Sequence, residues 1–218
     1  MLHQLELQFN EELVLRAEDS TNYIIIHHSD VSTPHTVEDI HRWHKKKGWA
    51  GIGYHYFISK DGEIYEGRPH DTVGAHALNF NKESIGVCFE GNFNKETMSE
   101  TQLNASVMLL SLLSLAYDDA EICEHMQLDK EKTCPGQNFP FDSLMKKVND
   151  LKASLKVLFG EPRSEDFIVN YEWRHFHDGM GDEEEERRRH NAPNCTHYGN
   201  FDYKSILSLF SEISEELT

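Results

Sequence analysis

The feature that most constrains the fold is the segment at residues 23–30, which reads YIIIHHSD. Residues of high β propensity run directly into two histidines, a serine and an aspartate. A short apolar run rich in β-branched residues predicts a buried strand. In an open α/β sheet, ligands usually bind at the carboxyl ends of the strands, which makes His27 a candidate ligand, although a lone histidine there is more often a hydrogen-bonded core residue.

Strand and helix signals alternate along residues 1–159. Strands are expected at 84–91 and in a hairpin at 54–67, whose turn is Lys-Asp-Gly. Helices are expected after two capping residues, Thr36 and Ser99, and again over 140–159, with Gly48 ending the first. This order predicts an α/β fold, with a central mixed β-sheet flanked by helices.

Composition excludes several classes of function. A formal net charge of −17 leaves no basic face for nucleic acid or for anionic lipid. No apolar run approaches the roughly 20 residues of a membrane span, so no membrane insertion is expected. The N-terminus lacks the basic region of a secretory signal, and the four cysteines have no disulfide-framework spacing. We therefore expect a chain that is cytoplasmic at synthesis.

A change in composition near Gly160 predicts a domain boundary, with a catalytic domain at 1–159 and an acidic extension at 160–218. Residues 202–217 have the pattern of an amphipathic helix, which could target a cell wall, form a homo-oligomer or dock on the catalytic domain. The extension also offers ligands for a second metal site, although their spacing matches no established zinc module: His175, His177, His190, Cys195 and His197.

Most of the 14 histidines are expected to have no ligand role. His41 and His44 lie in a basic helix and are interpreted as part of a solvated face. His27, with His125 and Cys134 from the segment CEHMQLDKEKTCPG, forms a different kind of set. Zinc accepts such nitrogen and sulfur ligands, and three of them leave the fourth position free for water. An inert buried Cys134 beside a surface His125 remains the alternative from spacing alone.

Several motifs occur in a specific order: IIIHHSD, IHRWHKKKGWAGIGYHYFISKDGEIYEGR, VGAHALNFNKESIGVCFEGNF and EHMQLDKEKTCPG. In these motifs the chain, from about residue 22 to 158, resembles the zinc-dependent N-acetylmuramoyl-L-alanine amidases of the peptidoglycan-recognition type, and most closely the short phage endolysins. The resemblance implies one zinc ion held by His27, His125 and Cys134, with Tyr54 and Lys132 as catalytic residues. It also implies that a zinc-activated water cleaves the amide between N-acetylmuramic acid and L-alanine.

Substrate contacts are expected at four residues. The stretch GAHALNFN resembles the family's peptide groove, which nominates His76 and Asn81. Arg68 could pair with a stem-peptide carboxylate through its planar fork. Trp49 could present a flat face to a sugar, or simply pack at the end of the preceding helix.

The pattern also separates this chain from related cytosolic amidases that recycle muropeptides. Those enzymes resemble it, but carry a glutamate base where Cys88 stands and an aspartate ligand where Cys134 stands. The favoured hypothesis is therefore a phage or prophage endolysin that acts on peptidoglycan after release, with Glu90 left open as a general base. A muropeptide-recycling amidase and a non-catalytic peptidoglycan-binding protein are the alternatives.

Overall fold

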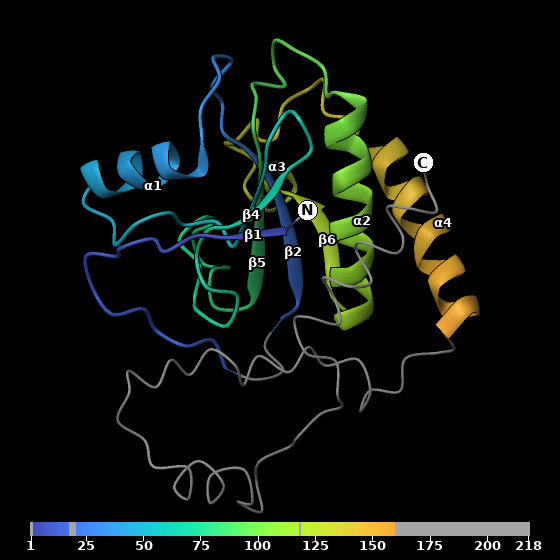
Figure 1. The fold of residues 1–218 in the computed structure, drawn as a ribbon, viewed down its shortest axis with the longest axis horizontal. Helices are drawn as coiled ribbons and strands as arrows, with labels where there is room; N and C mark the ends of the chain where they lie inside the picture. Colours follow the sequence, from blue (N-terminus) through green and yellow to red (C-terminus); the bar gives the residue numbers. More distant parts are fainter. Residues whose placement is uncertain (1, 18–20, 118, 160–218) are drawn as a thin grey trace, which may run out of the picture. The chain divides into compact units, whose positions relative to one another are not determined.

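Six strands form one sheet in the order β1-β4-β3-β5-β2-β6 (Figure 1). The structure is a computed structural model that describes residues 2–17, 21–117 and 119–159. Its strands are β1 (Leu2–Gln4), β2 (Tyr23–His28), β3 (Tyr56–Ile58), β4 (Ile64–Glu66), β5 (Ser84–Phe89) and β6 (Glu121–Glu124). Its helices are α1 (Val37–Lys46), α2 (Glu100–Ala116), α3 (His125–Leu128) and α4 (Phe141–Phe159).

The sheet is mixed, as the sequence predicts. The β3–β4 hairpin is antiparallel, and every other neighbouring pair of strands is parallel. Helix α1 lies on one side of the strands, and α2 lies on the other side with α4 beyond it (Figure 1). Helices α2 and α4 are joined by the Ser111 hydroxyl, which donates to the carbonyl oxygen of Val148 at 3.2 Å.

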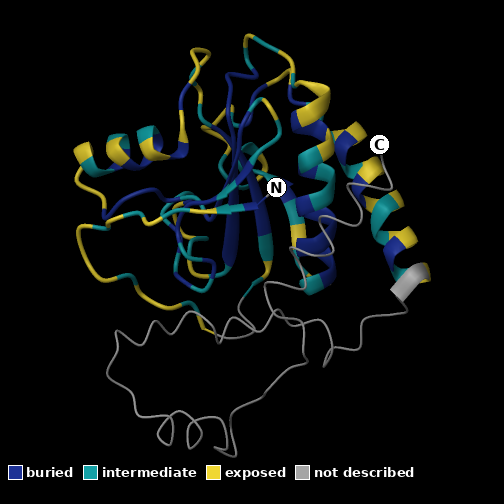
Figure 2. Ribbon diagram, viewed as in Figure 1, coloured by how far each residue is buried: buried dark blue, intermediate teal, exposed yellow. Residues whose placement is uncertain are grey.

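Strand β2 lies inside the sheet, where it pairs with β5 on one side and β6 on the other. Its isoleucines Ile24, Ile25 and Ile26 are completely buried, and Figure 2 shows β5 and most of β2 in the colour of buried residues. A strand covered on both faces shows no polar alternation, which explains the unbroken apolar run.

Local signals place the ends of the elements. Thr36 caps α1, because its hydroxyl oxygen accepts the N–H of Asp39 at 3.3 Å while the Asp39 carboxylate accepts the Thr36 N–H at 3.0 Å. Ser99 caps α2 in the same position. Gly62, with φ +86°, supplies the left-handed conformation that the β3–β4 turn needs.

Replacing Thr36 with alanine is expected to lower the free energy of unfolding by about 1 kcal/mol, because the first turn of α1 loses its reciprocal cap. Urea denaturation measures this change. Thr33→Ala is the matched control, since Thr33 is an exposed threonine outside the helix. Equal effects of the two substitutions would contradict a capping contribution.

The interpretation of His41 and His44 as a solvated face is wrong, since each is only 7% exposed. His41 Nδ1 accepts the N–H of Ile52, and His44 Nδ1 accepts the N–H of Gly53. Burial lowers the pKa of both rings, for His44 to about 4. These neutral rings therefore anchor the loop after α1 instead of facing water.

The described helices include none with the length and apolar character needed to cross a membrane. A compact unit comprises Met1–Ser154, and a second unit, Leu155–Thr218, begins within α4. The predicted acidic extension, its oligomerising helix and its second set of metal ligands lie outside the described residues. The domain boundary after residue 159 stays a prediction.

Candidate metal centre

Parallel pairing of β2 with β6 brings the two predicted histidine ligands together. The register aligns Ile26 with Glu124, so the next residues, His27 and His125, stand side by side at the carboxyl ends of their strands. Their ring centroids are 4.5 Å apart. His125 is the first residue of α3, directly after β6.

The third predicted ligand is held by the turn that follows α3. The carbonyl oxygen of Cys134 accepts the N–H of Met126 at 2.9 Å, and its sulfur accepts the N–H of His28 at 3.4 Å. Gly136, with φ +113°, packs against the backbone of Phe93, which a Cβ atom would meet at 2.5 Å. Residues 134–136 therefore form a tight turn that fixes the direction of the thiol.

The donor set fits a tetrahedral zinc ion. Candidate ligand atoms of His27, His125 and Cys134 all lie within 4.8 Å of one another, and among the described residues no fourth such side chain joins them. His27 Nδ1 lies 3.7 Å from Cys134 Sγ. Zinc bond lengths of about 2.0–2.1 Å to nitrogen and 2.3 Å to sulfur place tetrahedral N and S ligands about 3.6 Å apart.

Protonation in the metal-free state follows from burial. Burial, reinforced by His125 and His28, holds the pKa of His27 well below its usual value, so the ring is neutral and its lone pair is available. Burial raises the pKa of Cys134 to about 12, although the N–H of His28 opposes the rise. The thiol is therefore protonated at neutral pH, and a bound metal would displace this proton.

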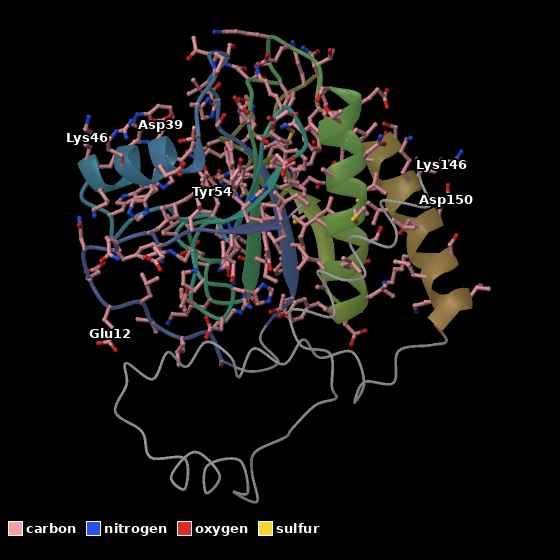
Figure 3. All side chains as sticks on the ribbon, in the orientation of Figure 1. Glu12, Asp39, Lys46, Tyr54, Lys146 and Asp150 are labelled. Carbon is pink, nitrogen blue, oxygen red and sulfur yellow. The ribbon has the colours of Figure 1, made fainter. Side chains whose placement is uncertain are left out.

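The two predicted catalytic residues lie around the three candidate ligands. The ring of Tyr54 is 5.1 Å from that of His27, and Figure 3 labels Tyr54 between α1 and the central strands. Among the described residues no group hydrogen-bonds the Tyr54 hydroxyl, and burial near Cys88 and Cys134 raises its pKa well above the usual value, so it remains a neutral donor. Lys132 is exposed, and its positive charge acts on both His125 and Cys134.

Of the predicted substrate residues, Trp49 is exposed and Arg68 is buried. Trp49 is 41% exposed, and its ring packs on His44, 4.6 Å between centroids. Arg68 is only 6% exposed and donates to the carbonyl oxygens of Ile52 and Val73. This geometry favours a structural role for Arg68 over the carboxylate contact expected from its sequence.

The other two predicted substrate residues lie on the loop before β5. Asn81 Oδ1 accepts the backbone N–H groups of His76 and Ala77, so its side chain shapes this loop. His76 Nδ1 lies 3.0 Å from Nε2 of the candidate ligand His27. The loop thus places His76 directly behind a candidate ligand, a relation that spacing in the sequence does not reveal.

Glu90 is the carboxylate that the sequence left open as a general base. It is buried, and its two oxygens accept the backbone N–H groups of His35 and Lys60. Cys88 is fully buried in β5, and pairs with His27 in the register of the sheet. Glu90 therefore has a structural role, and Cys88 packs in the sheet as a small apolar residue.

Comparisons with known proteins agree with this geometry. The chain is 32% identical over 127 residues to the endolysin of Escherichia phage T7, a match that covers 55% of this chain and 83% of that protein. It is 36% identical over 131 residues to peptidoglycan-recognition protein SC2 of Drosophila melanogaster, covering 54% of this chain and 69% of that protein.

A solved structure and a family profile extend the match. The endolysin N-acetylmuramoyl-L-alanine amidase LysCS from Clostridium intestinale superposes with a TM-score of 0.64 at 34% identity, covering 68% of this chain and 95% of that chain. The profile of the N-acetylmuramoyl-L-alanine amidase family matches residues 17–137, which include β2, the β3–β4 hairpin and all three candidate ligands. The chain belongs to the N-acetylmuramoyl-L-alanine amidase family.

Proposed function

We propose that this chain is a zinc-dependent N-acetylmuramoyl-L-alanine amidase that cleaves the amide joining N-acetylmuramic acid to L-alanine in peptidoglycan. The observation that carries the proposal is the convergence of His27, His125 and Cys134 at the carboxyl ends of two paired strands. Three protein ligands leave one zinc position open, which is typical of catalytic rather than structural sites.

A zinc ion held there would act as a Lewis acid that activates water for attack on an amide carbonyl. The chain's own residues then have separate tasks. The Lys132 ammonium, exposed beside the ligands, stabilises the negative charge that develops on the carbonyl oxygen. The Tyr54 hydroxyl, a neutral donor without a protein partner among the described residues, can orient the attacking water or donate to the same oxygen.

Substrate would approach along the exposed side of this site. We propose Trp49 as a flat apolar contact, because 41% of it is exposed and a row of rings, His44 and Tyr54, connects it to His27. Asn81 supports the adjoining loop through its backbone contacts. The partner class is peptidoglycan or muropeptides, and peptidoglycan is also named in the similar peptidoglycan-recognition protein SC2.

The biological role proposed is that of an endolysin, which acts on the cell wall after release from the cytoplasm. This rests on the similarity to the endolysin of phage T7 and on Cys134 as the sulfur ligand. The similarity to peptidoglycan-recognition protein SC2 makes a binding protein the second candidate. A complete set of three ligands favours the enzyme, because binding alone needs no metal position open to water.

Metal removal tests the proposal. The purified protein should contain about one zinc ion per chain and should release new L-alanine amino termini from peptidoglycan. A chelator should abolish this release, and added zinc should restore it. Full hydrolysis by metal-free protein would contradict the zinc mechanism. Cleavage of soluble muropeptides but not of intact walls would indicate a recycling role, and zinc binding without any cleavage would indicate a binding protein.

A further inference from the structure

We propose that His76 is a positioning residue, which holds His27 in the tautomer that leaves Nδ1 free for the metal ion. It acts through a relay of hydrogen bonds that runs from His27 through His76 and Ser84 to the backbone of Phe80. This inference rests on the zinc centre proposed above, and it gives His76 a role different from the substrate contact expected from its sequence.

The two ring nitrogens of His27 face different partners. Nδ1 lies 3.7 Å from Cys134 Sγ, on the side of the candidate ligands. Nε2 lies 3.0 Å from Nδ1 of His76. A nitrogen that binds a metal carries no proton, so the proton of the neutral ring must be on Nε2 and must be donated to His76.

The position of this proton determines where His76 and Ser84 carry theirs. His76 accepts at Nδ1, so its own proton is on Nε2, which lies 3.4 Å from Ser84 Oγ. The Ser84 hydroxyl donates to the carbonyl oxygen of Phe80 at 2.7 Å, which leaves its oxygen free to accept from His76. A proton on Nδ1 of His76 would instead require the His27 proton to move to the metal-binding nitrogen.

The fold fixes His76 independently of any metal. Asn81 Oδ1 accepts the N–H of His76 at 2.8 Å, which sets the backbone. The imidazole packs over two glycines: a Cβ atom on Gly74 would come within 2.5 Å of the ring, and one on Gly86 within 2.6 Å. Glycine at both positions makes room for the ring, so the acceptor is placed before a metal arrives.

The chemistry of this acceptor affects the charge of the site. Ligating histidines usually donate their second N–H to a carboxylate, a backbone carbonyl or water. His76 instead offers Nδ1 of an imidazole, 3.0 Å from His27 Nε2, and an imidazole that accepts a hydrogen bond there is uncharged. A neutral acceptor orients His27 without adding negative charge, and therefore leaves the positive charge of the metal available to polarise a substrate carbonyl.

Two substitutions distinguish the loss of the hydrogen-bond acceptor from a change in the size of the side chain. His76→Phe keeps a ring over the glycines but removes the acceptor, and is expected to raise the zinc dissociation constant by about 10–100-fold. His76→Asn places Oδ1 where Nδ1 stands and should restore most of the affinity. The measurement is chelator competition, alongside the melting temperature of each zinc-free protein and KM for soluble muropeptide.

The outcomes are distinct. Weaker zinc binding by the Phe variant, rescued in the Asn variant at equal zinc-free stability, supports the relay. Unchanged zinc affinity with a raised KM would overturn it in favour of a substrate contact, and equal losses in both variants would also overturn it. Failure of the wild-type protein to bind zinc would instead remove the proposed function itself.

A second measurement needs no substitution. Nitrogen-15 NMR of the imidazoles in the zinc-loaded wild-type protein should show His76 as the neutral tautomer with its proton on Nε2, and His27 with a slowly exchanging Nε2 proton. A His76 ring protonated on Nδ1 would overturn the relay even if the Phe variant fails to fold.

Discussion

A Cys134→Ser protein is expected to lose zinc and to lose amidase activity by at least about 10³-fold, since the Lewis-acid contribution of a catalytic metal amounts to several kcal/mol. Serine keeps nearly the same shape, so the turn at residues 134–136 can form. Its hydroxyl, however, keeps its proton near neutral pH and is a poor ligand, whereas a thiol gives up its proton when it binds zinc. Metal content and release of L-alanine amino termini are the measurements.

The matched control is Cys123→Ala. Cys123 is a buried cysteine in β6 that packs with Ile25 and Ala77, and it is not among the three candidate ligands. Its removal should cost stability through lost packing but leave the zinc content at the wild-type value. Retention of zinc and full activity in the Cys134 variant would refute the proposed ligand set.

Much of the fold could be predicted because its signals are local. Strand β2 follows from its apolar run, the start of α1 from Thr36, and the β3–β4 turn from Gly62 with its positive φ. Each of these features depends on residues that are neighbours in the chain. Which residues of α1 are exposed depends instead on segments far away in the chain, and here the interpretation from the sequence was wrong.

His41 and His44 are buried because remote segments cover them. His41 contacts the carbonyl oxygen of Gln8 in the N-terminal segment, and Phe9 packs on its ring with 5.0 Å between the centroids. The loop at residues 51–53 covers the other side and donates backbone N–H groups to both rings. The sequence of a helix gives no information about such partners. The basic residues beside His41 and His44 therefore suggested, wrongly, that both histidines face solvent.

The candidate metal centre could be predicted only in part from the sequence. Residue types identified His27, His125 and Cys134 as potential ligands, but nothing in their spacing establishes that β2 and β6 pair in parallel. The family resemblance assigned the three residues to one ligand set, but the strand pairing that brings them together is visible only in the structure. The resemblance did not supply the relation between His27 and His76, which depends on the path of a loop past two glycines.

Replacing Lys132 with methionine is expected to lower kcat by about 10²–10³-fold while zinc content stays unchanged, because the substitution removes a charge that is needed mainly when the oxyanion forms. Methionine keeps the length of an exposed, flexible side chain, so the loop before Cys134 should keep its conformation. Steady-state kinetics on a soluble muropeptide, with metal analysis of the same sample, measures the effect.

Lys130→Met is the matched control, since it removes the same charge from another exposed residue two positions earlier on the same loop. A general attraction of anionic substrate to the loop would make both variants raise KM by similar factors and would weaken with salt. A catalytic role predicts instead that only the Lys132 variant loses kcat, and that added salt does not imitate the loss. Equal kinetics for the two variants would therefore assign the oxyanion contact to Tyr54 alone, the remaining neutral donor at the site.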